Sequence, residues 1–497
     1  MFFYKLNNII KKLFSREGSI SKKTIQGTFW LFAFRVVDQS FAFAQTIILA
    51  HIISPQDFGL FGIAFISISV LDSLFSQTGF QQALIQKKDS IESYLDTAWV
   101  IQLSRAVILT ATLILIAPFV ASIFNTPQAA LISQVVALSI LIQGFVNVGL
   151  IYFNKALEFN KYFIYQFFGR LVDFAVVAAA AFIFRNVWAL VFGLLAGNLM
   201  RLVVSYALQG YRPHFRFDYK KAKELFNFGK WVYGSNIISF FMAQGDTVFV
   251  AKMLGALPLG FYQVGYKISS IASADIISGA IFPAYSKIQY DMSRLREAYL
   301  KTAKILFFIM APVAGGIIAV AAEFTVLFLG RQWLPSVPIM LVLSLSGFVS
   351  ILGVLSAPVL KATGKPKIET KYNVVRLVVL MVLLFPLIKI WGILGASITV
   401  LLSVVISMVG MTIEVIKITE CHWFRFIKEV VFPIASSLLM IVFVSFAKNF
   451  IAKDFIGFFI LVSLGVVSYF FFIFLSAKFL NYRIYATIKE SFLTLVS

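Results

Sequence analysis

Long apolar runs occupy most of this chain and are separated by short polar corners or corners that contain Pro and Gly. The runs are repeatedly about 20 residues long, the length at which a helix crosses the hydrocarbon core of a bilayer. The pattern therefore predicts an all-α, polytopic membrane protein with about fourteen transmembrane helices. We place them at residues 27–51, 58–85, 95–122, 130–152, 162–184, 187–209, 231–254, 260–288, 303–328, 335–360, 370–388, 391–416, 430–447 and 455–478.

The longest polar connection follows the sixth predicted helix and contains the segment KKAKELF, which predicts a short surface helix. This connection divides the predicted helices into two sets of six, followed by two extra helices. The predicted domains are an amphipathic cytoplasmic segment (1–24), an N-terminal six-helix bundle (25–209), a cytoplasmic linker (210–230), a C-terminal six-helix bundle (231–418), two extra helices (430–478) and a cytoplasmic tail (479–497).

The two predicted bundles are similar in sequence. Aligning Trp30 with Trp231 places the corner SPQDFG of residues 54–59 on GALPLG of residues 255–260. Proline ends a helix and glycine permits close backbone approach, so both corners separate consecutive helices. The predicted hinge or corner residues are Pro55, Gly59, Pro258 and Gly260. We interpret the bundles as homologous halves related by a pseudo-two-fold axis roughly along the membrane normal.

The distribution of Lys and Arg predicts the orientation in the membrane. Basic residues concentrate in alternate connections, and short loops rich in Lys and Arg stay in the cytoplasm. Both termini are therefore predicted to be cytoplasmic. The net charge of +21 and the 60% hydrophobic composition agree with a membrane protein attracted to anionic lipid, so the charge requires no nucleic acid partner.

The first predicted hairpin resembles a known family. Arg35 near the middle of the first helix, the SPQDFG corner, and a second helix ending in TGFQQALIQKK are similar to polysaccharide flippases of the multidrug/oligosaccharidyl-lipid/polysaccharide exporter superfamily. The lipopolysaccharide and colanic acid exporter branch, often called Wzx-type, is the most similar. The resemblance is most specific over residues 25–90.

The resemblance implies a MATE-like fold and a location in the bacterial cytoplasmic (inner) membrane. It also implies a flippase that moves undecaprenyl-diphosphate-linked oligosaccharide to the outer face for O-antigen, capsule or exopolysaccharide synthesis. Alternating access through a cationic central cavity would carry the cargo, and the two extra helices would help to hold its lipid tail. Its implied partners are the lipid-linked oligosaccharide, membrane lipids, and polysaccharide polymerase and chain-length machinery.

Basic residues inside the predicted helices are the main candidates for contact with cargo. A cation at a helix centre costs roughly 2.5–3.5 kcal/mol if it faces lipid, so these residues should face water or opposite charge. The cavity cations that we predict to bind the diphosphate are Arg35, Arg105, Arg170, Arg201 and Lys267. The other basic residues in or near these helices are Lys230, Lys252 and Arg376.

Structural roles for the same charges stay open. Arg35 with Asp38, and Arg170 with Asp173, are spaced for ion pairs within one helix. Arg105 and Lys267 have no acidic residue within one turn, so each needs a partner from another helix or a bound anion. Lys230 and Lys252 lie near helix ends and could extend to the membrane surface. Asp72 fits either a hydrogen-bond cluster or the sugar path.

Two carboxylates are candidates for ion coupling, because an intramembrane carboxylate is a common proton or sodium site. They are Asp38 and Asp246. Asp246 could instead neutralise Lys252 or a cation of the facing bundle. An uncoupled flippase driven by polymerisation outside is equally open.

Several function classes are disfavoured. No phosphate-binding G-x-x-x-x-G-K-[ST] loop occurs, and His51, His214, His422 and the single Cys421 are scattered, so no cofactor or structural metal is expected. Short outer loops argue against an enzyme. The alternatives that we keep are a lipid II flippase, a cation-coupled drug exporter, and an integral polysaccharide polymerase or scaffold.

Overall fold

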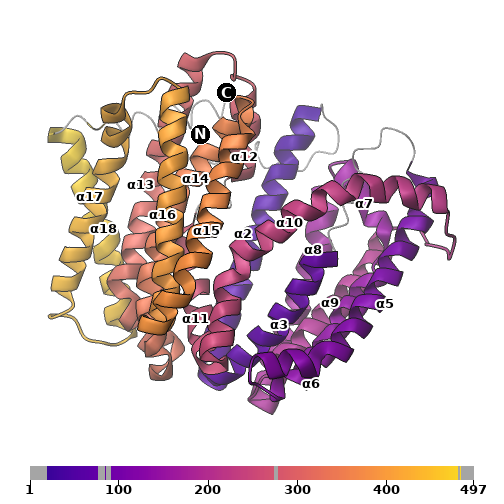
Figure 1. The fold of residues 1–497 in the computed structure, drawn as a ribbon. Coiled ribbons are helices and arrows are strands. Elements are labelled where there is room, and N and C mark those ends of the chain that lie inside the picture. Colours follow the sequence, from indigo (N-terminus) through magenta and orange to yellow (C-terminus); the bar gives the residue numbers. More distant parts are fainter. Residues whose placement is uncertain (1–19, 76–83, 85–90, 274–277, 480–481, 483–497) are drawn as a thin grey trace, which may run out of the picture. The chain divides into compact units, whose positions relative to one another are not determined.

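The computed structural model describes residues 20–75, 84, 91–273, 278–479 and 482. Within these ranges every regular element is a helix, which confirms the predicted all-α class (Figure 1). Most of the amphipathic N-terminal segment, the end of the first hairpin and most of the C-terminal tail lie outside the described residues.

The chain divides into two compact units, and helix α10 contributes to both. Unit 1 comprises Met1–Gln244 and Gly255–Leu257, and unit 2 comprises Gly245–Leu254 and Pro258–Ser497. The described helices before the division are α2 (Ile20–Ile52), α3 (Pro55–Phe75), α5 (Glu92–Ile123), α6 (Gln128–Gly144), η1 (Val148–Leu150), α7 (Ile151–Lys155), α8 (Phe159–Phe184), α9 (Trp188–Leu208) and α10 (Tyr219–Leu254).

Unit 1 is a helical bundle in which consecutive helices of a hairpin pack together and α2 runs parallel to α8. Helix α8 packs along α9, α5 along α6, and α2 against α8. One apolar cluster joins the end of α2 to α8 and α9 through Leu49, Ile53, Val177, Ala181 and Ala189, all nearly inaccessible to solvent. The alanines keep the backbones close, as small residues do between membrane helices.

Unit 2 repeats this order of neighbours and adds two helices. Helix α15 packs along α16, α13 along α14, and α17 against both α13 and α18. The elements of this unit are α11 (Ala256–Ser269), η2 (Ser270–Ala272), α12 (Ser278–Ser286), α13 (Met292–Phe324), η3 (Thr325–Leu329), η4 (Arg331–Ser336), α14 (Val337–Ala362), α15 (Pro366–Trp391), α16 (Ile393–Ile418), α17 (Trp423–Ala447) and α18 (Phe455–Phe479).

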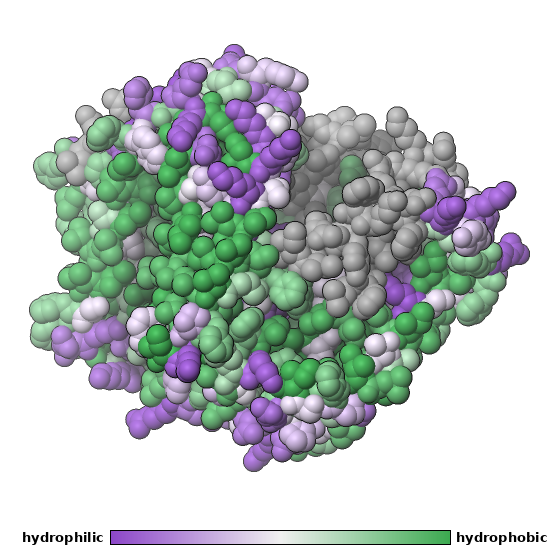
Figure 2. All heavy atoms as spheres, viewed as in Figure 1, coloured by the Kyte–Doolittle hydropathy of each residue, from purple (hydrophilic) through white to green (hydrophobic). Residues whose placement is uncertain are grey.

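The helices are long and apolar enough to cross a membrane. Among the described residues, 10 helices meet this criterion, or up to 11 if one bent pair counts as a single span. Over α13, α14 and α16–α18, Figure 2 shows a broad hydrophobic band between hydrophilic rims. The protein is a multi-span membrane protein, while the count of fourteen helices stays a prediction.

Two predicted spans differ from the observed helices. The fourth, predicted over 130–152, ends at Gly144, and the following segment Val148–Lys155 is bent away by 67°. The bend follows Asn147, whose extended backbone is fixed because its side chain accepts from the Gly149 N–H at 2.9 Å. The eighth, predicted over 260–288, is interrupted at Ser273, where the backbone is extended.

The predicted linker 210–230 is part helix and part packed loop. Helix α10 begins at Tyr219 and continues through the predicted seventh span to Leu254. The loop before it lies on the start of α5, where Tyr211 donates to Asp96 and the His214 N–H donates to Asp96 Oδ1 at 2.9 Å. Lys221 Nζ donates to the Ser93 carbonyl at 2.8 Å. Hydrogen bonds therefore hold the first part of the connection against the start of α5.

The two predicted corners are built differently. At the first, α3 begins at Pro55, and Ser54 Oγ both donates to Asp57 Oδ2 at 2.6 Å and accepts from the Asp57 N–H at 3.2 Å. This reciprocal cap satisfies groups at the helix start. At the second corner α10 ends at Leu254 and α11 begins at Ala256, so Pro258 lies in the first turn of α11. Proline is tolerated there because the first backbone N–H groups of a helix lack helical partners.

Candidate functional site

A polar network connects α2, α8 and α9 inside unit 1. Arg170 of α8 lies at its centre: Nη1 donates to Asp173 Oδ2 on the same helix, and Nε is 3.3 Å from Asp38 Oδ1 of α2. The Arg170 and Asp173 side chains are only 15% and 12% exposed, whereas the Asp38 side chain is 42% exposed. Arg170 therefore has two carboxylate partners. Asp173 lies on the same helix, and Asp38 links α8 to α2.

Arg201 of α9 packs against Gly169 of α8, the residue before Arg170, and has different partners. Its Nε donates to Gln166 Oε1 of α8 at 3.2 Å, and its Nη1 donates to Asn198 Oδ1 at 3.1 Å. Both acceptors are neutral amides, which orient the guanidinium without cancelling its charge. We refer to Asp38, Gln166, Arg170, Asp173, Asn198 and Arg201 as the α2–α8–α9 network.

Close packing of α8 on α9 brings these side chains together. A Cβ at Gly197 would lie 2.8 Å from Asp173 Cβ and 2.9 Å from the Gly169 carbonyl oxygen. A larger residue would push the helices apart, since both distances are shorter than normal carbon contacts. The network contains two guanidinium groups and two carboxylates, so it carries no net charge when all four are ionised.

A second charged pair lies across α3 and α5. Arg105 interacts electrostatically with Asp72, and both side chains are half-buried. Asp72 is therefore an acidic residue of another helix whose charge acts on Arg105. The sequence pattern offered both residues as candidates but did not pair them, because they lie on separate helices.

Unit 2 contains a buried carboxylate near the end of α10. Asp246 is 3% exposed and accepts from Tyr262 Oη of α11 at 2.5 Å and from the Thr247 N–H at 2.8 Å. Arg376 of α15 interacts with it electrostatically. A cation of α15 in the same unit therefore acts on Asp246. Sequence analysis did not select Tyr262, since a tyrosine in an apolar helix carries no signal of such a partner.

The remaining candidate residues lie on α2, α10 and α11. Arg35 is exposed on α2, Lys252 is exposed in the last turn of α10, and Lys267 is half-buried in the last turn of α11. Asp38 lies three residues from Arg35 on α2, but it also pairs with Arg170 of α8. The side chain of Lys230 lies outside the described residues.

The described part of the chain offers no metal centre. No group of three or more His, Cys, Asp or Glu residues there could hold a metal ion. Cys421, between α16 and α17, is buried, and this burial raises the pKa of its thiol. A thiol held in its neutral form is a weak nucleophile and a weak metal ligand.

Comparison with known proteins identifies the relatives of this fold. The family model described as "Polysaccharide biosynthesis protein" matches residues 48–338. The lipopolysaccharide biosynthesis protein WzxC of Escherichia coli (strain K12) is 26% identical over 404 residues, 80% of this chain and 80% of that protein. The succinoglycan biosynthesis transport protein ExoT of Rhizobium meliloti (strain 1021) is 25% identical over 340 residues, 68% of each chain.

Among solved structures, the lipid II flippase MurJ in an inward closed conformation covers 92% of this chain and 100% of its own, with a TM-score of 0.73 and 14% identity. This likeness confirms the predicted fold of the exporter superfamily. Since the family model matches more than half of the chain, this membrane-spanning helical protein belongs to the polysaccharide biosynthesis protein family.

Proposed function

We propose that this protein is a flippase that moves a lipid-linked oligosaccharide from the cytoplasmic to the outer face of the membrane. Its relatives are named for lipopolysaccharide biosynthesis and succinoglycan transport, which supports a transporter rather than an enzyme. The observation that carries the proposal is the α2–α8–α9 network, because charged groups inside apolar helices are kept where a polar cargo passes.

Arg201 is the proposed contact for the diphosphate of the cargo. A lipid-linked oligosaccharide joins a long apolar tail to a hydrated glycan through an anionic diphosphate. Arg201 is half-buried and held by two neutral amides, so its planar guanidinium keeps its positive charge and its bidentate geometry for phosphate. Arg170 is already engaged by Asp38 and Asp173, which favours a role in holding the network together.

Asp246 is the proposed site of ion coupling. It is buried beside the Tyr262 hydroxyl and the Thr247 hydroxyl, which are 2.5 Å and 3.3 Å from its carboxylate oxygens. Oxygen ligands of this kind suit either a proton or sodium. Transport by Asp246→Asn should lose its dependence on an imposed proton or sodium gradient. If Asp246→Asn and Asp38→Asn both keep the wild-type gradient response, neither carboxylate is the coupling site.

A test in the producing cell separates transport from polymerisation. A strain without this chain should lose surface polysaccharide and retain single lipid-linked repeat units on the cytoplasmic face, protected from a glycosidase added outside. Loss of a polymerase would instead leave single repeat units exposed to that glycosidase. Exposed repeat units in the deletion strain would therefore contradict the proposed function.

A further inference from the structure

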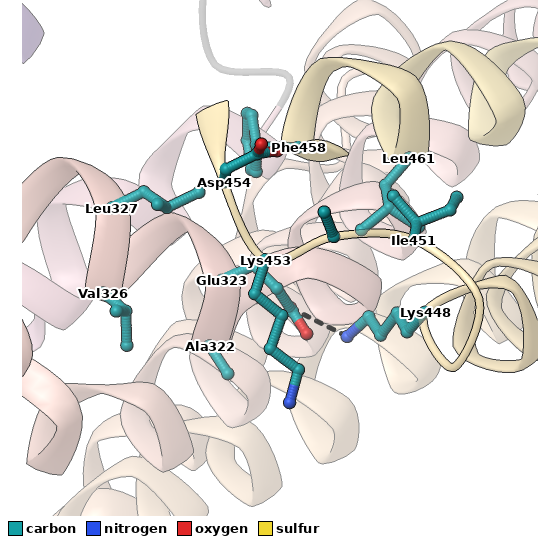
Figure 3. A pocket seen from close by; sticks show the side chains of 11 residues that line it. Ala322, Glu323, Val326, Leu327, Lys448, Ile451, Lys453, Asp454, Phe458 and Leu461 are labelled. Carbon is teal, nitrogen blue, oxygen red and sulfur yellow. Dashed lines mark ion pairs between the residues drawn. The ribbon is translucent and has the colours of Figure 1, made fainter. Parts of the chain in front are cut away.

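A small pocket lies between the end of α13 with η3, which belong to the second predicted set of six helices, and the α17–α18 loop with the start of α18, which belong to the two extra helices. Its volume is about 170 Å³. One wall is apolar and contains Val326, Leu327, Phe458 and Leu461. The other wall is charged and contains Glu323, Lys448 and Lys453, while Asp454 also lines the pocket (Figure 3).

The two acidic side chains of the pocket have partners within the protein. Glu323 Oε2 is 2.8 Å from Lys448 Nζ, and both side chains are largely buried. Asp454 Oδ1 accepts from the Gly457 N–H at 2.7 Å and so caps the start of α18. In Figure 3 the Asp454 carboxylate lies beside Phe458, on the side of the pocket away from the two ammonium groups.

Lys453 supplies a positive charge without such a partner. It is exposed in the loop between α17 and α18, and the described residues provide it with no ion pair. Lys448 lies next to it and is held by a single carboxylate. The pocket therefore presents ammonium groups at its mouth, beside an apolar wall.

Apolar surface continues from the pocket onto the face of α18. Phe328 packs against Phe455 and Phe458 with ring centroids 5.4 and 5.1 Å apart, which fixes the loop to η3. Phe455 and Phe459 remain 54% and 60% exposed. A molecule with an anionic head and apolar chains matches this arrangement, because its head meets Lys453 while its chains cover the phenylalanines.

We infer that this pocket binds the phosphate headgroup of an anionic membrane phospholipid. The small volume admits a headgroup and excludes a hydrated oligosaccharide, so the site is separate from the proposed cargo path. The Glu323–Lys448 pair sets the affinity, since Glu323 competes with the lipid phosphate for the Lys448 ammonium. The inference holds whichever cargo the protein moves and whichever face of the membrane the pocket occupies.

The test measures lipid binding to the full chain by native mass spectrometry, with phosphatidylglycerol as the probe. Lys453→Gln should weaken phosphatidylglycerol binding about fivefold. Lys389→Gln is the matched control, because Lys389 is also exposed in unit 2 but does not line the pocket. It should leave binding unchanged. Equal binding by the wild type and Lys453→Gln, or equal losses in both variants, would overturn the inference.

A second variant changes binding in the opposite direction. Glu323→Gln removes the carboxylate that holds Lys448, so phosphatidylglycerol should bind several-fold more tightly, whereas damage to the fold would weaken it. Weaker binding by a folded Glu323→Gln protein would contradict the inference. If this variant does not fold, the comparison of Lys453→Gln with Lys389→Gln is the deciding test.

A competitor identifies the source of the phosphate. Inorganic phosphate at equal concentration should fail to displace phosphatidylglycerol from the wild type, because it lacks the apolar chains that cover the phenylalanines. Displacement by inorganic phosphate would indicate a free-phosphate site and would overturn the inference.

Discussion

At the scale of single residues, Arg170 shows how an intramembrane charge is held. Its guanidinium joins two carboxylates from different helices, so it stabilises the contact of α2 with α8 as well as α8 itself. The two carboxylates differ in exposure, at 12% for the Asp173 side chain and 42% for Asp38. Their contributions to stability should differ accordingly.

We expect Asp173→Asn to lower the stability of the protein more than Asp38→Asn. Breaking a buried ion pair typically costs about 3–5 kcal/mol because one charge is left uncompensated. An exposed pair contributes at most about 1 kcal/mol. The unfolding temperatures of the two purified variants in detergent provide the measurement. Equal shifts would show that Asp38 and Asp173 hold Arg170 equally.

The Arg105–Asp72 interaction allows a structural role to be separated from a role in transport. Arg105→Gln should lower the amount of folded protein in the membrane, because Asp72 loses its cation. The double variant Arg105→Gln with Asp72→Asn should recover part of that loss, since the effects of charges that interact are not additive. The amount of folded protein and the transport rate are measured for Arg35→Gln and Lys267→Gln as well, for comparison with Arg105→Gln. If the double variant is folded but transports more slowly than Asp72→Asn alone, Arg105 acts on the cargo as first predicted.

At the scale of helices, the first corner depends on close backbone approach. A Cβ at Gly59 would lie 1.7 Å from the carbonyl oxygen of Ala256, and a backbone atom cannot rotate away. Gly59→Ala should therefore destabilise the protein by about 1–3 kcal/mol through overpacking. Gly316→Ala is the control, because nothing lies within 4 Å of its added Cβ. A Gly59→Ala protein that unfolds at the wild-type temperature would contradict this packing.

The loop before α10 should resist proteolysis while Tyr211 remains protonated. Burial, followed by its hydrogen bond to Asp96, raises the pKa of Tyr211 above the ordinary value of 10.0. The protonated hydroxyl is the donor, so this stabilisation is fully present below pH 10 and is lost as the pH rises further. Tyr211→Phe removes the donor at every pH.

Limited trypsin digestion of the full chain measures this effect at Arg216, since Arg212 precedes Pro213 and trypsin does not cleave that bond. Cleavage at pH 8 should be faster in Tyr211→Phe than in the wild type. Tyr219→Phe is the matched control, because Tyr219 is 71% exposed. Equal cleavage rates in all three proteins would show that the bond to Asp96 does not fasten the loop.

The sequence predicted the positions of the helices better than the side-chain contacts between them. Runs of apolar residues located most spans, and Pro55 marked the break between α2 and α3, although α3 begins at Pro55 and not at the predicted residue 58. The bend at Asn147 was missed because it depends on a cap and on Tyr211, 64 residues away. The Asp246–Tyr262 bond and the Arg105–Asp72 pair were missed for the same reason: each joins two helices, and periodicity describes only one helix at a time.

At the scale of the whole molecule, the two units share an order of packing. Helices α5 and α6 pack together as α13 and α14 do, and α8 packs along α9 as α15 packs along α16. This correspondence supports the predicted repeat, which is typical of transporters that alternate access. The predicted cationic path, the orientation of the termini and the role of the corners as hinges stay predictions.

Transport by the purified protein is the most direct test of the proposed function. Vesicles that contain only this chain should move a fluorescent undecaprenyl-diphosphate oligosaccharide between leaflets, measured as protection from a membrane-impermeant quencher. Arg201→Gln should slow this movement at least tenfold while the fold is retained, whereas Lys389→Gln should not. Movement no faster than in protein-free vesicles, under an imposed proton or sodium gradient and without one, would contradict the claim that this chain is a flippase.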